Sequence, residues 1–201
     1  EMGFANTMVV MKLQEEVVKN MISEAIKRNA AELELLGITL KVPGEKYMTY
    51  EETIKLLNKN GLKLKVGDDL NPEAEKKLGE LFPDTLLFVL TWPSTCRPFY
   101  VMPKDGHADA EFTEGFDLIY KGLEISSGGQ RIHLPELLIK GLKKKGEKPE
   151  KFKDYVDSFR YGAPPHAGWS IGLERLTLLV CGLDNIREAT MFPRDRERLT
   201  P

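Results

Sequence analysis

The sequence of 201 residues lacks several features that mark particular classes of protein. It contains only two cysteines, Cys96 and Cys181, whose spacing fits neither a disulfide framework nor a zinc site. No long apolar run is present, so no membrane span is expected, and the first residues lack the pattern of a signal peptide. The net charge of -2 gives no overall basic field that would attract nucleic acid. These absences predict a globular protein with a cytoplasmic location.

The composition itself is typical of a folded domain. Hydrophobic residues make up 41% and charged residues 30% of the chain, which is enough apolar material for one sizeable core. The chain opens on Glu1, with Met2 behind it. We expect from this start that the chain is a piece of a longer protein.

The first part of the sequence has the periodicity of helices. Apolar residues recur at helical spacing from Thr7 to Ala30. Thr49 and Glu52 form a capping-box pattern, and Asn71 followed by Pro72 is a typical helix start. We interpret about 32–82 as a charged helical insertion on the surface of the main domain.

From Thr85 onward the pattern changes to strands mixed with helices. Strands are predicted at 85–92, 97–102, 116–120, 123–127 and 190–193, and helices at 135–145 and 149–160. The two central strands read as a hairpin that turns at Lys121 and Gly122. This order indicates an α+β fold with an antiparallel or mixed sheet.

The predicted hairpin carries two carboxylates on one face. With a turn at Lys121–Gly122, Ile119 faces Glu124 and Asp117 faces Ser126. Asp117 and Glu124 are then diagonal neighbours whose side chains converge on one cation, and Mg²⁺ is a hard ion that prefers such oxygen ligands. The alternative interpretation is a pair of solvated acids on an open sheet face.

Small residues follow this pair. The run from Ser126 to Gly129 packs poorly in a strand, which indicates a bulge or a ligand against the backbone. A bulge at Gly128–Gly129 would place Arg131 on the face of Glu124, where its guanidinium could clamp a carboxylate in bidentate fashion. The alternative is an arginine paired with a surface acid.

A second glycine-rich stretch runs from Gly168 to Arg175 and leads into an apolar helix. Gly168 and Gly172 leave room for a ligand to approach the backbone. Arg175 offers a permanently charged planar group suited to phosphate.

The remaining polar candidates each have two interpretations. His166 either contacts a nucleotide or hydrogen-bonds only the backbone, and His133 could cap the helix that follows it. His107 is expected to be exposed. The lysine run 143–145 either touches an RNA backbone or is the solvated end of a helix, which its dipole favours.

Several of these strings resemble one known family. The residues from Gly172 to Arg175, with the apolar helix behind them, are similar to motif 3 of class II aminoacyl-tRNA synthetases. Three further stretches, 122–133, 159–168 and 192–196, together with Arg97 to Tyr100, resemble aspartyl-tRNA synthetases of the archaeal and eukaryotic type. The resemblance covers essentially the whole chain and is densest after Arg97.

The resemblance implies a six- or seven-stranded antiparallel sheet flanked by helices, with motif 3 at 168–182. It implies that aspartate attacks the α-phosphate of ATP and that the aspartyl group of the adenylate then passes to tRNA-Asp, or also tRNA-Asn. The implied metal ligands for Mg²⁺ are Asp117, Glu124 and Ser127, and the implied aspartate contacts are Ser127 and Arg131. ATP is expected at Glu124 and at Gly172, Leu173, Glu174 and Arg175, with Arg175 on the γ-phosphate. Arg175, Glu124 and Arg131 are the expected catalytic residues, and no protein general base is needed because the aspartate carboxylate is already ionised.

The chain departs from the family pattern in what it lacks. Motif 1, motif 2 and the anticodon-binding barrel are absent, so we expect the isolated chain to be inactive. The resemblance implies that the full-length parent is a homodimer. Asparaginyl-tRNA synthetase or an asparagine-synthesising paralogue is one alternative, since Arg131 does not discriminate between them. A non-catalytic module of the same fold is the other.

Overall fold

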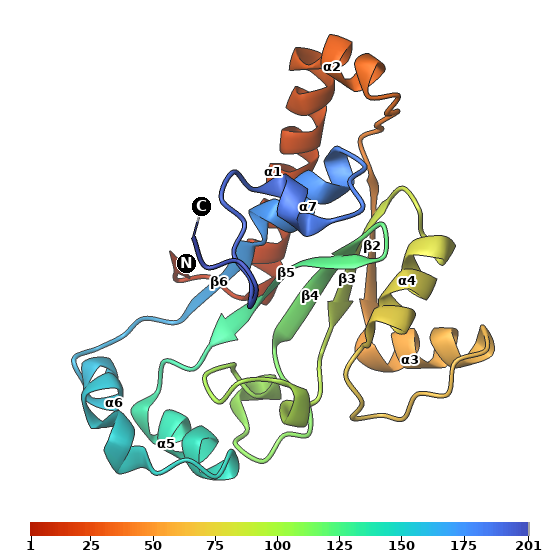
Figure 1. The fold of residues 1–201 in the computed structure, drawn as a ribbon. Helices are drawn as coiled ribbons and strands as arrows, with labels where there is room; N and C mark the ends of the chain where they lie inside the picture. Colours follow the sequence, from red (N-terminus) through yellow and green to blue (C-terminus); the bar gives the residue numbers. More distant parts are fainter. Residues whose placement is uncertain (201) are drawn as a thin grey trace.

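The computed structural model describes residues 1–200 and contains a six-stranded mixed sheet covered by helices on both faces (Figure 1). The strand order is β1-β6-β5-β4-β3-β2. Only the β2–β3 pair of this sheet is parallel, so the sheet is mixed, which is one of the two arrangements that the sequence predicted, whereas the resemblance implied an antiparallel one. The strands are β1 (Met2–Gly3), β2 (Gly44–Thr49), β3 (Thr85–Leu90), β4 (Gly115–Tyr120), β5 (Leu123–Arg131) and β6 (His166–Ile171).

Helices make up most of the remaining structure. The α-helices are α1 (Thr7–Arg28), α2 (Ala30–Leu35), α3 (Tyr50–Lys59), α4 (Pro72–Leu81), α5 (Pro135–Lys144), α6 (Lys153–Arg160) and α7 (Leu173–Val180). The short 3-10 helices are η1 (Ser94–Cys96), η2 (Lys104–Gly106), η3 (Pro149–Phe152) and η4 (Ile186–Ala189). Among the described residues, no helix is both long and apolar enough to cross a bilayer.

The sheet separates two cores. On one face α1 and α7 pack over alternate residues of the central strands, including Phe88, Phe116 and Leu118. On the other face α3 and α4 cover Leu87, Val89 and other residues near the β2 edge. A third cluster of buried residues joins α5 and α6. Figure 1 shows these two helices below the sheet. The second face also carries the polar residues of β4 and β5 that are described below.

The segment 32–82 differs from the expected surface insertion. It supplies β2, which pairs with β3, and the fully buried side chains of Tyr50 and Leu57 belong to the second core. The sequence does not predict β2, because Gly44–Thr49 is an edge strand whose residues are exposed or half-buried and so lack a clear alternation of apolar and polar side chains. The expected caps are present, since Thr49 and Glu52 form a capping box and Asn71 caps α4.

Two predicted strands are absent from the described residues. The stretch 97–102 is a loop with one isolated bridge at Val101. The stretch 190–193 is irregular and follows η4. In both stretches a proline flanks the apolar residues, Pro98 before them and Pro193 after them, and proline cannot donate a hydrogen bond to a strand ladder.

Helix α4 lies directly against the β4–β5 turn. A Cβ atom on Gly79 would stand 2.6 Å from the Gly122 Cα and 2.8 Å from the Lys121 carbonyl carbon. Gly122 has a φ of 80°, as the turn requires, and its own missing Cβ faces the Lys76 Cα at 3.1 Å. The two glycines therefore allow backbone-to-backbone contact between the helix and the hairpin.

We predict that Gly79→Ala destabilises the fold, although alanine favours helix by about 1 kcal/mol. The added methyl group would meet main-chain atoms that cannot move alone, so we expect a loss of about 1–3 kcal/mol in the free energy of unfolding. Urea denaturation measures this change. The matched control is Glu80→Ala at the next, exposed position, with an expected change within about 0.5 kcal/mol. A Gly79→Ala protein as stable as the parent would contradict the close approach.

Candidate active site

An extra residue in β5 determines which side chains share a face. Ile119 pairs with Glu124 as predicted, but Leu118 pairs with Ser126, so Ile125 has no counterpart on β4. Ile125 and Ser126 both point toward α1, where Ser126 accepts a hydrogen bond from Gln14. Asp117 therefore pairs with Ser127, and the expected pairing with Ser126 is wrong.

The bulge at Ile125 also places Arg131 on the predicted face, although the bulge was expected at Gly128–Gly129. Regular pairing runs through Gly128 and Gly129, so the bulge expected there is absent. Because alternation resumes after Ile125, Ser127 and Arg131 lie on the same face as Glu124. Gly128 faces the α1 core, where a Cβ atom would stand 2.7 Å from both Phe116 and Trp169.

Asp117 is buried and paired with an arginine that the sequence did not single out for this role. Its carboxylate Oδ2 accepts a hydrogen bond from Nη2 of Arg97, and the side chain of Asp117 is only 6% exposed. The guanidinium of Arg97 also lies over the Trp92 ring, 4.2 Å from its centre. Oδ1 of Asp117 has no hydrogen-bond partner. Burial raises the pKa of Asp117, and the positive charge of Arg97 opposes that rise.

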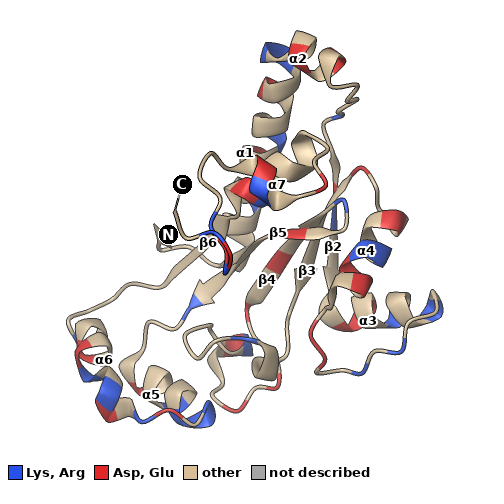
Figure 2. Ribbon diagram, viewed as in Figure 1, with Lys and Arg blue, Asp and Glu red and all other residues tan. Residues whose placement is uncertain are grey.

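The backbone of Glu124 is held by two side chains. Its N–H donates to Oε2 of Glu75 at 2.7 Å, and its carbonyl oxygen accepts a hydrogen bond from Nη1 of Arg175 at 2.5 Å. Figure 2 shows acidic positions side by side on β4 and β5, with further acidic positions on α4. The strand that carries Glu124 is thus tied to α4 and to the start of α7.

Four carboxylates line a cavity of about 140 Å³ beside the hairpin. They belong to Asp69, Glu75, Asp117 and Glu124, and Trp92 forms part of the wall. Burial, with the nearby charge of Asp117, raises the pKa of Glu124 to about 7. Burial likewise raises the pKa of Glu75. Negative charge in the cavity is therefore poorly solvated, and a bound cation would stabilise it.

The cavity is not a preformed metal cage. Within residues 1–200, no three His, Cys, Asp or Glu side chains are grouped closely enough to hold a metal ion. The donor set nonetheless suits Mg²⁺, which takes one or two carboxylates and completes its shell with water and phosphate. The unpartnered Oδ1 of Asp117 is such an oxygen. The residues therefore fit a Mg²⁺ site in which the protein supplies part of the ligands and the phosphate of a substrate supplies the rest.

Arg131 lies at the other end of the same face. It binds Oε1 of Glu1 through Nε at 3.1 Å and Nη2 at 2.9 Å, and its guanidinium lies near the Tyr100 ring. The Glu1 carboxylate fills the space that a side chain on Gly168 would need. Both contacts go to one oxygen of the exposed Glu1 carboxylate, so the structure shows the alternative, an arginine paired with a surface acid, and the bidentate clamp stays a prediction.

The glycine-rich stretch brings Arg175 to the hairpin. Gly172 precedes α7, and the side chain of Arg175 folds back beside it, so that a Cβ on Gly172 would be in ordinary van der Waals contact with the Arg175 Cδ at 3.4 Å. Leu173, Glu174 and Arg175 form the exposed first turn of α7. The structure therefore brings Arg175 beside Glu124 and leaves Leu173 and Glu174 on the surface.

The histidines lie outside the acidic cavity. Nδ1 of His166 is 2.9 Å from the Pro164 carbonyl oxygen, which matches the backbone interpretation. His133 does not cap α5, whose N-cap is Leu134. His107 is exposed, as expected.

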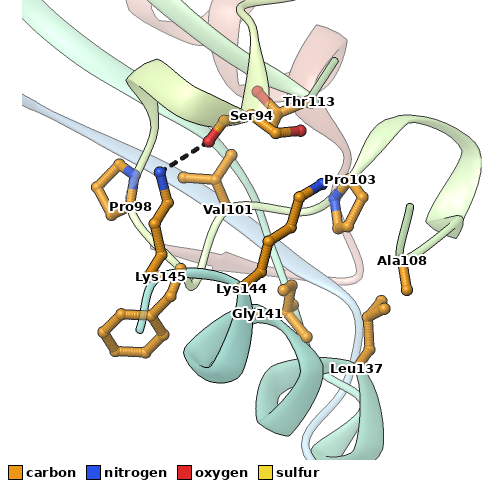
Figure 3. A pocket seen from close by; sticks show the side chains of 12 residues that line it. Ser94, Pro98, Val101, Pro103, Ala108, Thr113, Leu137, Gly141, Lys144 and Lys145 are labelled. Carbon is orange, nitrogen blue, oxygen red and sulfur yellow. Dashed lines mark hydrogen bonds between the residues drawn. The ribbon is translucent and has the colours of Figure 1, made fainter. Parts of the chain in front are cut away.

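The lysine run 143–145 is exposed at the end of α5, and its last residue also holds a loop. Lys145 donates to the carbonyl oxygens of Ser94 and Thr95 at 2.8 and 2.9 Å, and Figure 3 shows it beside a small apolar pocket between α5 and this loop. Arg97 follows directly in this loop, so Lys145 helps to fix the segment that pairs with Asp117.

Comparison with known proteins places the chain in a family. The sequence profile of tRNA synthetases class II (D, K and N) matches residues 1–196. The chain belongs to this family. Its six-stranded sheet and flanking helices are accordingly the α+β fold of class II aminoacyl-tRNA synthetases.

The similar proteins carry consistent names. The chain is 46% identical to the aspartate–tRNA(Asp/Asn) ligase of Methanocaldococcus jannaschii, covering all of this chain and 46% of that protein. It is 44% identical to the aspartate–tRNA(Asp) ligase of Thermoplasma acidophilum, covering all of this chain and 47% of that protein. The chain spans about half the length of these curated relatives.

Solved structures of an aspartyl- and an asparaginyl-tRNA synthetase are similar in fold to this chain. The aspartyl tRNA synthetase from Entamoeba histolytica has a TM-score of 0.89 and 37% identity, over all of this chain and 43% of that one. The asparaginyl-tRNA synthetase from Pyrococcus horikoshii has a TM-score of 0.91 and 30% identity, over 99% of this chain and 48% of that one.

The raised pKa of Glu124 predicts a dependence of stability on pH. Its pKa rises from 4.5 to about 7 in the folded protein. The folded protein therefore binds this proton more tightly than the unfolded chain, and the stability that Glu124 contributes below pH 4.5 is lost as pH rises toward 7. Glu124→Gln should raise the free energy of unfolding more at about pH 8 than at about pH 5. Urea denaturation at both pH values measures the difference.

The control for this experiment is Glu150→Gln, an exposed acid on η3. It should change stability equally little at both pH values. If Glu124→Gln behaves in the same way, the Glu124 carboxylate is not in a poorly solvated environment.

Proposed function

We propose that this chain is part of the catalytic domain of an aspartate–tRNA ligase, with motif 3 at 168–182. In this proposal the enzyme joins L-aspartate to ATP as aspartyl-adenylate and transfers the aspartyl group to tRNA. The observation that carries it is the arrangement along β5, where Glu124 and Ser127 share a face with Arg131. Arg131 is the fourth residue after Ser127, a distance of roughly 13 Å along the strand. That span accommodates an amino acid joined to a phosphate.

The proposed roles follow from charge. Arg131 pairs with the side-chain carboxylate of aspartate and replaces its contact with Glu1. Arg175 leaves the Glu124 carbonyl oxygen and binds phosphate at the far end. With the substrate carboxylate already ionised, positioning and neutralisation of phosphate charge supply the catalysis.

ATP is the substrate that this family uses, and we propose Mg²⁺ as its counter-ion. Asp117, Glu124 and Ser127 would hold the metal, which neutralises phosphate charge when bound. Support comes from the unpartnered Asp117 oxygen and from the raised pKa of Glu124. Gly172, Leu173 and Glu174 are proposed contacts to ATP, since their turn leads into Arg175.

Aspartate is favoured over asparagine as the amino acid. Identity is 42–46% with the curated aspartate–tRNA ligases and 28–30% with the asparaginyl-tRNA synthetases of known structure. Both tRNA(Asp) and tRNA(Asp/Asn) occur in the names of these relatives. We further propose tRNA-Asp as partner, a homodimer and a cytoplasmic location, which two free cysteines fit.

The proposal predicts that Arg131→Ala abolishes aspartate-dependent exchange of pyrophosphate into ATP. Removing one partner of a desolvated charge pair costs about 3 kcal/mol, so a loss of roughly 100-fold or more is expected. The assay uses the natural gene product that carries these residues, with aspartate and with asparagine.

Arg160→Ala is the matched control, because Arg160 is a half-exposed arginine on α6 that pairs with Asp157 and Glu136. It should leave exchange unchanged. Exchange with asparagine alone would favour the asparaginyl alternative. No exchange with either amino acid would favour a non-catalytic module.

A further inference from the structure

Glu75 reaches the candidate site from α4, on a segment that sequence patterns placed on the surface. Its Oε2 accepts the N–H of Glu124 at 2.7 Å. Strand β6 pairs with β5 only from Ser126 onward, so Glu124 lies beyond the end of its neighbouring strand. The carboxylate of Glu75 thus takes the place of a strand partner for that N–H.

The main chain at Glu124 needs such support because the bulge begins there. A bulged residue is left out of the regular ladder, which weakens the pairing locally. On the β4 side, Glu124 pairs with Ile119 and the register then shifts. On the open side, Glu75 holds the N–H and Arg175 holds the carbonyl oxygen.

The position of Glu75 is itself fixed by close packing. The missing Cβ atom of Gly122 faces the Glu75 carbonyl oxygen at 3.2 Å and the Lys76 Cα at 3.1 Å. Gly79 faces the same turn one helical turn later. A helix seated on the hairpin backbone in this way gives the Glu75 side chain a fixed reach to Glu124.

We propose that Glu75 is a positioning residue for the nucleotide end of the site. It holds the main chain at Glu124 so that the Glu124 carboxylate faces the cavity beside Asp117. This inference rests on the proposed function for its effect on catalysis. The hold on the Glu124 N–H is independent of that function.

Two substitutions at Glu75 separate the effect of its side-chain length from the effect of its negative charge. Glu75→Gln keeps the length and an oxygen that can accept the N–H, but it removes the charge. Glu75→Asp keeps the charge and withdraws the oxygen by one methylene. If Glu75 acts through the hydrogen bond, Glu75→Gln should behave like the parent protein and Glu75→Asp should not.

The first readout is hydrogen exchange of the Glu124 amide, followed by NMR. A hydrogen bond to a charged group is worth enough that its loss should speed exchange by about tenfold or more in Glu75→Asp. Glu75→Gln should stay within a few-fold of the parent. Equal rates in all three proteins would overturn the proposed hold, whatever the enzyme's activity.

The second readout is pyrophosphate exchange in the natural gene product. Glu75→Asp should raise the KM for Mg²⁺–ATP about tenfold and leave the KM for aspartate unchanged, while Glu75→Gln restores the parent value. Glu80→Ala, an exposed position on the same helix, is the control and should change neither KM. Equal losses in Glu75→Asp and Glu75→Gln would overturn the positioning role.

A parent protein with no aspartate-dependent exchange would refute the proposed function instead. The amide exchange of Glu124 would then still decide whether Glu75 holds the hairpin. The two failures are therefore distinguishable.

Discussion

One extra residue in β5 is the constraint on which the site depends. Ile125 enters the α1 core together with Ser126, and this displacement resets the alternation of every residue after it. Ser127 and Arg131 consequently share a face with Glu124, while Gly128 remains under Phe116 and Trp169. Without the extra residue, strict alternation would turn Arg131 toward the apolar core, where an unpaired charge is costly. The core and the polar face are therefore two results of the same register shift.

The site also depends on stabilising the negative charge that is buried in the sheet. Asp117 is nearly inaccessible and relies on Arg97, which in turn lies over Trp92. Arg97 sits in a loop that Lys145 ties to α5 through the carbonyl oxygens of Ser94 and Thr95. The lysine run is the exposed end of α5, as one interpretation predicted, and its last residue, Lys145, also fixes the loop that carries Arg97. The remaining acids of the cavity, with their raised pKa values, leave room for a cation.

Local sequence patterns predicted the hairpin turn, the main helices and the caps at Thr49 and Asn71, because each depends on neighbouring residues. They missed β2, an exposed edge strand, and they placed the bulge at the glycines when packing against α1 puts it at Ile125. Arg97 and Glu75 were also missed as site residues. Both reach the hairpin from distant segments, and only the Arg97 to Tyr100 string gave any signal. The face shared by Asp117, Glu124 and Arg131 was predicted, whereas the contacts that hold it depend on tertiary structure.

The most direct test of this account is paramagnetic broadening of backbone amide signals by Mn²⁺ in the presence of ATP. Mn²⁺ prefers the same oxygen ligands as Mg²⁺. The account predicts that broadening centres on Asp117, Glu124 and Ser127 and extends to Arg175. Broadening centred instead on surface acids such as Asp154 and Asp157 of α6, with the hairpin signals unchanged, would contradict it.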